Sequence, residues 1–210
     1  MKFKFYALWL LLLCIIVFIL QSFFTGFTEF FILDSSRVYE FWRFFTSMFL
    51  HADIGHLAYN MFALALFGSI LEKLIGSRGF LVSFFVSGIL ANIISVNFYS
   101  SSLGASGAIF GVIGTLILVR PMMTIWAFSM PMPIFLAGIL WAVGDLIGAY
   151  GFLVGNPLNN TGNIAHLSGM LIGLLLGVFY RDWKRKKEVK KEIIVEEDIR
   201  NWEDSYMSNS

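Results

Sequence analysis

Six long stretches of the chain are apolar and almost free of charged residues, and polar segments separate them. A helix needs about 20 such residues to cross roughly 30 Å of hydrocarbon. The pattern therefore predicts an all-α membrane protein, with six transmembrane helices in residues 1–180 and a charged tail in residues 181–210. The expected spans are residues 5–24, 54–71, 79–98, 105–119, 134–152 and 163–180.

The composition indicates a lipid environment. Of the 210 residues, 58% are hydrophobic and 14% are charged, whereas a soluble domain is about 25% charged. The 23 Phe, 6 Trp and 7 Tyr carry too much apolar surface for a disordered chain. A soluble globule and a disordered chain are both excluded, and the net charge of +1 gives no reason to expect a nucleic-acid partner. The single cysteine, Cys14, excludes a disulfide within one chain.

The basic residues predict the orientation of the spans, because lysine and arginine collect on the cytoplasmic side of short connections. With six alternating helices, all of the 15 basic residues except Arg37 and Arg43 fall on one side. We therefore expect a multi-pass protein of the cell membrane with both termini in the cytoplasm. The first span follows Lys2 and Lys4 but is too long for the apolar region of a signal peptide, so we expect it to remain as an anchor.

The connections between the spans differ in kind. Residues 25–50 mix many phenylalanines with charged side chains, which is typical of a segment that lies in the membrane interface. Residues 121–133 contain three prolines, which break helices, so we expect a cytoplasmic turn there. The tail mixes basic, acidic and apolar residues, which favours a solvated or surface helix. A contact with lipid headgroups or a partner protein is the alternative.

Polar side chains inside apolar spans are costly and usually functional, so they are the informative residues. Counted back from Arg120 and Arg181 at about 1.5 Å per residue, Ser106 lies about 21 Å and His166 about 22 Å from the cytoplasmic end of its helix. The two side chains therefore share a depth. The polar residues in or beside the spans are His51, Asp53, His56, Asn60, Asn92, Ser106, Asp145 and His166.

A further pair of polar residues lies in the same layer. His56 and Asn60 are 16 and 12 residues before Glu72, which places them about 24 and 18 Å from that end. Their i,i+4 spacing puts both on one helix face. The span that begins near Ser106 is too short to cross about 30 Å, so the loop at residues 100–105 must enter the membrane. Irregular backbone at that depth needs protein or water around it, so we expect a water-filled cavity.

Glycines predict that the helices carrying Ser106 and His166 approach each other closely. Small residues every fourth position allow two backbones to come near enough for short side chains to meet. A serine that can pass its proton to a neutral imidazole is an activated nucleophile. His56, Asn60 and the backbone N–H at Ser106 can then donate hydrogen bonds to an oxyanion. The glycines are Gly107 and Gly111 on one helix and Gly169, Gly173 and Gly177 on the other.

Several motifs together resemble those of the rhomboid intramembrane serine proteases. They extend from Trp42 to Gly177 in the family's order and spacing, which makes the signal specific. The motifs are Trp42-Arg43, the set His51, His56 and Asn60, then Glu72-Lys73 with Gly76-Ser77, Gly104-Ala105-Ser106-Gly107, and Ala165-His166-Leu167-Ser168-Gly169.

The resemblance implies a six-helix rhomboid-like bundle with a catalytic dyad of Ser106 and His166. It also implies an oxyanion site formed by His56, Asn60 and the backbone amide of Ser106. The family uses no third acid, so Asp145 is interpreted as a structural carboxylate.

The remaining motif residues have supporting roles in this resemblance. His51 matches a position that holds the loop, and Phe110 stands where many members have a tyrosine stacked on the histidine. Gly104 and Gly107 belong to the nucleophile motif, and Trp42 and Arg43 belong to the first loop. We expect no cofactor. We also expect no metal, because His51 and His56 would lie about 140° apart around a helix.

The enzyme hypothesis predicts cleavage of transmembrane segments in membrane-protein substrates, near their extracytoplasmic end. Helix-breaking residues in the substrate are expected to favour cleavage, because a peptide bond inside a helix is protected from attack. The alternative is a catalytically inactive rhomboid-like scaffold that binds transmembrane segments. Such scaffolds typically lose the serine or the histidine, and this chain retains both. A transporter would need paired charges or discontinuous helices at the middle of the membrane.

Overall fold

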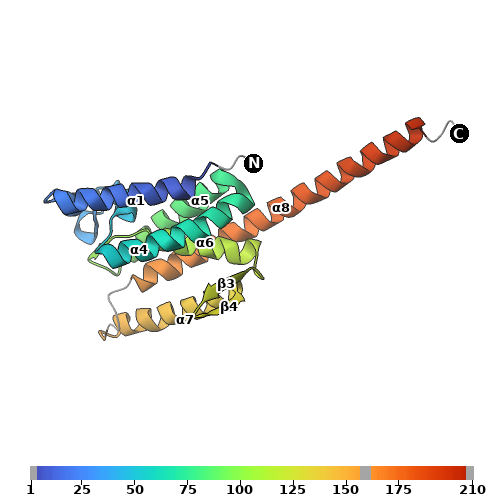
Figure 1. The fold of residues 1–210 in the computed structure, drawn as a ribbon. Coiled ribbons are helices and arrows are strands. Elements are labelled where there is room, and N and C mark those ends of the chain that lie inside the picture. The colour runs from blue at the N-terminus through green and yellow to red at the C-terminus, as the bar shows by residue number, and fades with distance from the viewer. Residues whose placement is uncertain (1–3, 157–161, 207–210) are drawn as a thin grey trace.

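The computed structural model describes residues 4–156 and 162–206, and the side chains of residues 183–195 and 201–206 lie outside that description. Most of the described length is helical. The helices form a bundle, and the last of them extends well beyond it (Figure 1). The main helical elements are α1 (Tyr6–Phe23), α4 (Ile54–Ala63), η3 (Leu64–Gly68), α5 (Ser69–Ser95), α6 (Ser106–Val119), α7 (Ile134–Leu153) and α8 (Asn163–Tyr206).

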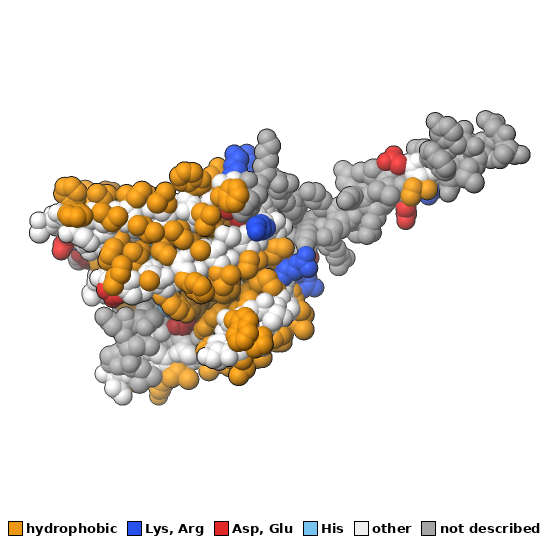
Figure 2. All heavy atoms as spheres, viewed as in Figure 1, with side chains coloured by type: hydrophobic (Ala, Val, Ile, Leu, Met, Phe, Trp, Pro, Cys, Tyr) orange, Lys and Arg blue, Asp and Glu red, His pale blue; other side chains and the backbone are white. Residues whose placement is uncertain are grey.

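Four helical stretches are long and apolar enough to cross a membrane, and α6 is a shorter apolar helix of 14 residues. Their outer surfaces are apolar, and Figure 2 shows hydrophobic side chains covering most of the visible face of the bundle. Large apolar residues such as Trp9, Tyr150 and Leu175 are more than 60% exposed. An apolar surface of this extent is that of a membrane protein. The four stretches are Tyr6–Phe23, Ile54–Ser95, Ile134–Leu153 and Asn163–Asp182.

The second and third expected spans form one helical stretch, Ile54–Ser95, of 42 residues. This stretch is not a single straight helix, because Gly76 has a non-helical backbone with φ 83° and ψ 162°. A positive φ is readily adopted only by glycine. The stretch therefore consists of two helical parts that meet at a kink, near the boundary that the charged residues Glu72, Lys73 and Arg78 indicate in the sequence. The count of six membrane crossings stays a prediction.

Glu72 fixes the start of α1 against α5. Its carboxylate accepts hydrogen bonds from the backbone N–H groups of Lys4, Tyr6 and Ala7, at 3.1 to 3.2 Å. It also accepts one from the hydroxyl of Ser77, at 2.6 Å. The first N–H groups of a helix have no acceptor within the helix, so a buried carboxylate from a neighbouring helix satisfies them here. The cost of burying this charge is offset by four donors.

The connection between α1 and α4 contains several short elements. These residues match the segment expected in the membrane interface, and aromatic side chains such as Phe41, 78% exposed, remain on its surface. Its strand β1 pairs antiparallel with β2, the strand that precedes α6. The connection therefore holds the loop that leads into α6. The elements are α2 (Phe27–Phe31), β1 (Leu33–Asp34), η1 (Ser35–Arg37), α3 (Arg43–Thr46), η2 (Ser47–Phe49) and, beyond α5, β2 (Ser101–Ser102).

The proline-rich segment after α6 is a short β-hairpin where the sequence predicts a simple turn, while the rest of the described chain is mostly helical. Strand β3 (Thr124–Ala127) pairs antiparallel with β4 (Met130–Pro133). Phe128 and Ser129 join them with φ angles of 52° and 62°, which is the backbone that a tight two-residue hairpin requires. Proline favours extended backbone around it and is tolerated in edge strands. The same prolines that end a helix therefore support this two-stranded ribbon.

Helices α6 and α8 pack with their backbones in direct contact, as the glycine spacing predicts. A Cβ atom added at Gly169 would overlap the carbonyl oxygen of Gly107, and one added at Gly173 would overlap that of Gly111. Thr115 Oγ1 donates to the carbonyl oxygen of Gly173 at 3.0 Å and so joins the two helices. The approach of α8 to α6 determines where the side chains at the first turns of the two helices, Ser106 and His166, meet.

Helix α8 continues past the bundle through the residues expected to form a separate tail (Figure 1). The backbone of this part is helical, as a solvated or surface helix predicts. The basic side chains at residues 184–187, which contributed to the predicted orientation, lie outside the described side chains. Figure 2 shows Lys and Arg side chains gathered at the end of the bundle from which α8 extends.

Candidate active site

Ser106 is the first residue of α6 and is half-buried. The preceding loop is held from two directions: β2 pairs with β1, and the backbone N–H of Gly104 donates to the carbonyl oxygen of Ser47 at 2.9 Å. Gly104 has a φ of 123°, a backbone conformation that residues other than glycine rarely adopt. The serine hydroxyl is therefore presented at a helix N-terminus by a restrained loop.

His166 on α8 lies directly beside this hydroxyl. Its Nε2 atom is 2.8 Å from Ser106 Oγ, which is hydrogen-bond distance. The imidazole is buried, and the ring of Phe110 stacks on it with centroids 4.3 Å apart and planes within 6°. Phe110 is one helical turn after Ser106, so the same helix supplies the hydroxyl and the surface that supports the histidine. The juxtaposition agrees with the shared depth and the glycine spacing, whereas the catalytic roles stay a prediction.

Asp145 on α7 also contacts the histidine, on the opposite side of the ring. Its Oδ1 atom is 3.1 Å from His166 Nδ1, and both residues are buried. Asp145 is interpreted from the sequence as a structural carboxylate, and its contact with His166 is not among the sequence-based predictions. The signal was depth, because Asp145 lies 11 residues after Ile134, the first residue of α7, or about 17 Å from that end of the helix at 1.5 Å per residue. That is within one helical turn of the depth counted for Ser106.

His56 lies next to the loop that precedes the serine. A Cβ atom added at Gly104 would lie 2.7 Å from Cε1 and 2.9 Å from Nε2 of His56, and 3.9 Å from Ser106 Oγ. The backbone N–H of Ala52 donates to His56 Nδ1 at 3.4 Å. A neutral imidazole that accepts at Nδ1 carries its proton on Nε2. The donor of His56 is therefore the nitrogen beside Gly104.

Asn60 is buried one turn further along α4, on the face that carries His56. Its Nδ2 donates to the carbonyl oxygen of His56 at 2.9 Å. At the start of the same helix, the carboxylate of Asp53 accepts from the backbone N–H of His56 at 2.8 Å and caps the helix. Asn60 and Asp53 both bond to the backbone of His56 and so hold this residue in position.

His51 is 1% exposed and its ring lies 5.1 Å, centroid to centroid, from that of His56. The side chain of Gln21 in α1 makes two hydrogen bonds to the backbone of His51. The N–H of His51 donates to Gln21 Oε1 at 3.0 Å, and Gln21 Nε2 donates to the His51 carbonyl oxygen at 3.2 Å. Burial, reinforced by the neighbouring His56, lowers the pKa of His51 to about 4. His51 is therefore neutral at pH 7, and its ring packs against the ring of His56.

Trp42 and Arg43 lie in the first connection and do not contribute to the Ser106–His166 contact. Arg43 is 1% exposed, donates to the carbonyl oxygens of Glu29 and Ile32 at 2.9 and 2.8 Å, and pairs with the carboxylate of Glu40 at 2.6 Å. Trp42 is 47% exposed. Arg43 therefore holds together the connection whose strand β1 fixes the loop before Ser106.

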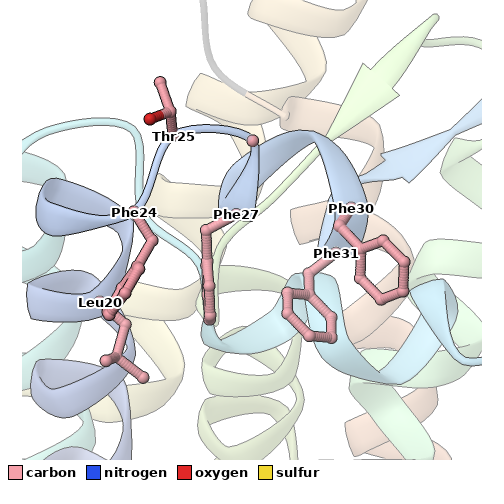
Figure 3. Close-up of a pocket in the computed structure, with 7 residues that line it drawn as sticks. Leu20, Phe24, Thr25, Phe27, Phe30 and Phe31 are labelled. Carbon is pink, nitrogen blue, oxygen red and sulfur yellow. The ribbon is translucent and has the colours of Figure 1, made fainter.

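The structure also has an apolar hollow of about 440 Å³ away from these residues. Figure 3 shows the aromatic ring of Phe24, just after α1, and those of three phenylalanines of α2 around it. No residue of the Ser106–His166 cluster lines it, so it is a feature of the first connection. The water-filled cavity expected beside the serine stays a prediction. The lining residues are Leu20, Phe24, Thr25, Gly26, Phe27, Phe30 and Phe31.

These features define the class of protein: a helical membrane protein in which a serine and a histidine from two closely packed helices are in hydrogen-bond contact. Residues 38–183 match the family model of the Rhomboid domain. The chain therefore belongs to the rhomboid family.

Individual relatives agree with this assignment. Over 145 residues, the chain is 32% identical to Rhomboid-like protein 11, chloroplastic, of Arabidopsis thaliana, covering 64% of this chain and 51% of the relative. Over 82 residues it is 45% identical to Rhomboid protease GluP of Bacillus subtilis, covering 38% of this chain and 16% of the relative. Over 144 residues it is 27% identical to Rhomboid protease GlpG of Yersinia pseudotuberculosis, covering 68% and 49%. The chain spans about half or less of the length of the relatives it matches.

Proposed function

We propose that this protein is a rhomboid-type serine endopeptidase that cleaves transmembrane segments of membrane-protein substrates. The observation that carries the proposal is the 2.8 Å contact between Ser106 Oγ and His166 Nε2. The imidazole takes the hydroxyl proton as Ser106 attacks the scissile carbonyl, and then returns a proton to the leaving amine. Water hydrolyses the acyl-enzyme in a second step, again with His166 as the base.

The groups around Ser106 suit the oxyanion of the tetrahedral intermediate. Ser106 begins a helix, and the first N–H groups of a helix have no acceptor within it and attract negative charge. His56 presents the N–H of Nε2 beside Gly104, next to the same position. Asn60 supports His56 and, in this proposal, supplies a further donor when substrate binds. Donors fixed in advance stabilise the charge without reorganising during the reaction.

The membrane arrangement that suits this activity has six crossings, with the stretch Ile54–Ser95 dividing at Gly76 and both termini in the cytoplasm. Support comes from the basic side chains at the end from which α8 extends (Figure 2). Ser106 is at the other end of α6, so it faces the extracytoplasmic half of the cell membrane. The substrate is then cut near its extracytoplasmic end, and helix-breaking residues there expose the peptide bond. The relatives also include plant proteins named as chloroplastic and mitochondrial.

The experiment that tests this function is cleavage of a model membrane substrate by purified protein in detergent and in liposomes. The substrate has one transmembrane segment with a glycine and a proline near its extracytoplasmic end. We expect wild type to cut it and Ser106→Ala and His166→Ala to leave it intact. Ser168→Ala is the matched control, because Ser168 donates to the carbonyl oxygen of Ile164 on its own helix and its loss should preserve cleavage.

An inactive scaffold that binds transmembrane segments predicts a different result. Wild type would then retain the substrate in pull-down without producing fragments, and Ser106→Ala would behave identically. Equal cleavage by wild type, Ser106→Ala and His166→Ala would show that a contaminating protease acts and would remove the support for the endopeptidase function.

A further inference from the structure

His166 contacts Asp145 as well as Ser106, so a third residue stands beside the proposed pair. We propose that Asp145 is a positioning residue for the histidine: its carboxylate holds the imidazole with the proton on Nδ1 and the lone pair of Nε2 directed at Ser106. The inference rests on the proposed function for its catalytic consequence. Its structural part, the proton position on His166, is independent of that function.

The assignment of the proton follows from the donors and acceptors present. An ionised carboxylate only accepts hydrogen bonds, so the nitrogen 3.1 Å from Asp145 Oδ1 must be the one that carries hydrogen. A neutral imidazole has one N–H, so Nε2 is left with its lone pair. Nε2 is the atom 2.8 Å from Ser106 Oγ. Asp145 therefore selects the form of the ring that can remove the serine proton.

Stacking on Phe110 does not make this selection. The rings of Phe110 and His166 are nearly parallel, at 6°, which fixes the plane of the imidazole. A half-turn of the ring about its bond to Cβ preserves that plane while exchanging the positions of the nitrogens and carbons. The carboxylate on the far edge favours one of the two orientations, because only one places an N–H against it. Phe110 thus fixes the plane of the His166 ring, and Asp145 fixes which nitrogen lies at each edge.

The packing of α7 on α8 explains how a carboxylate reaches this position. Asp145 is buried, while its neighbours Leu146 and Ile147 are 57% and 54% exposed. One turn along the same face, Gly148 leaves room for Asn163 at the start of α8, because a Cβ there would overlap the amide of Asn163. The face of α7 that carries Asp145 therefore packs on α8. A carboxylate in a membrane helix is costly and usually has a function.

A second consequence concerns the charge that develops during the reaction. When Nε2 takes the proton from Ser106, the ring becomes an imidazolium with an N–H on both nitrogens. The Asp145 carboxylate, already at hydrogen-bond distance from Nδ1, stabilises that cation by accepting the hydrogen bond from its N–H. The proton returns from Nε2 to the leaving amine, so no proton moves to Asp145. Loss of the carboxylate is therefore expected to lower kcat more than it changes KM, since Asp145 does not touch the substrate.

The direct test is nuclear magnetic resonance on protein labelled with ¹⁵N-histidine, because the chain has only three histidines. Long-range proton–nitrogen correlations distinguish a ring nitrogen that carries hydrogen from one that does not. We expect the Nδ1–H form for His166 in wild type and in Ser106→Ala. In Asp145→Asn the side-chain amide can donate to Nδ1, and we expect the Nε2–H form. An unchanged Nδ1–H form in Asp145→Asn would overturn the proposal.

Kinetics provide the second readout, with the substrate described above. We expect Asp145→Asn to lower kcat at least about tenfold with KM within about twofold of wild type. Asp145→Glu keeps the charge and should recover part of kcat. Asp182→Asn makes the same chemical change at an exposed carboxylate of α8 and should match wild type. Wild-type kcat in Asp145→Asn, or a kcat in Asp145→Glu no higher than in Asp145→Asn, would contradict the positioning role.

The two readouts separate this inference from the proposed function. If wild type cleaves nothing, the endopeptidase function fails, and the spectra alone decide whether Asp145 sets the proton on His166. If Asp145→Asn does not fold, Asp145→Leu takes its place in both measurements, because leucine has a similar volume and suits a membrane helix. We expect Asp145→Leu to lose the Nδ1–H preference, and retention of that preference would overturn the inference.

Discussion

Gly104 controls the distance between His56 and the serine through its missing side chain. Its backbone has a φ of 123° and its Cβ position is already filled by the His56 ring. Any side chain there both strains the loop and displaces the candidate oxyanion donor. In the proposed mechanism, Gly104 therefore affects the chemistry without taking part in it.

Replacing Gly104 with alanine should lower kcat/KM at least about tenfold, because a displaced donor no longer reaches the oxyanion. The measurement is cleavage of the model substrate. Gly26→Ala is the matched control, because Gly26 also has a positive φ, of 82°, but nothing lies within 4 Å of its Cβ position. It carries the strain alone and should keep kcat/KM near the wild-type value. Equal losses in both variants would show that strain, and not contact with His56, matters.

His51 makes the folded state sensitive to acid. Its pKa of about 4 in the folded protein lies below the ordinary value near 6.5. Between these values the unfolded chain binds a proton that the folded chain does not, so stability falls as the pH drops from about 6.5 to about 4. Above about pH 6.5, His51 is neutral in both the folded and the unfolded chain and no longer lowers the stability. The shift corresponds to about 3 kcal/mol.

His51→Asn, which cannot titrate, should lose this part of the pH dependence. Thermal unfolding in detergent at several pH values measures it: wild type should lose stability more steeply than the variant between pH 6.5 and pH 4. Parallel curves for the two proteins would show that folding does not lower the pKa of His51. Such a result would remove its role as a neutral support for His56.

At the scale of the elements, the contact of α6 with α8 is the feature on which the site depends. Two glycines of α8 face carbonyl oxygens of α6 with no room for a methyl group. A hydrogen bond from Thr115 Oγ1 to the carbonyl oxygen of Gly173 also joins the two helices. Small residues at such an interface allow close packing of membrane helices. The position of His166 beside Ser106 follows from the register of these two helices.

Gly173→Ala should destabilise the protein by about 1–3 kcal/mol or more, because the new methyl group forces the helices apart. Thermal unfolding in detergent gives the effect on stability, and cleavage gives the effect on the site. Gly144→Ala on α7 is the control, since nothing lies within 4 Å of its Cβ position and alanine favours helix over glycine. We expect no loss of stability there. Equal stability of both variants would contradict the packing described for α6 and α8.

For the molecule as a whole, periodicity and depth predict the helices and the meeting of Ser106 with His166. The spans are set by hydrophobic length, and the contact is set by glycines whose spacing is visible in the sequence. Two features were not predictable in this way. The pairing of β1 with β2 depends on hydrogen bonds between segments far apart in the sequence, Leu33 with Ser102 and Asp34 with Ser101. The contact of Asp145 depends on which face of α7 packs on α8, and a helix that is apolar all round does not reveal that face.

In the proposed function, Ser106 is a nucleophile that His166 activates. The most direct measurement is mass spectrometry of the protein after reaction with a fluorophosphonate, which forms a covalent adduct with an activated serine. We expect one adduct, on Ser106 in wild type, which is absent in Ser106→Ala and forms far more slowly in His166→Ala. An adduct on a different residue, or formation at the wild-type rate in His166→Ala, would contradict it.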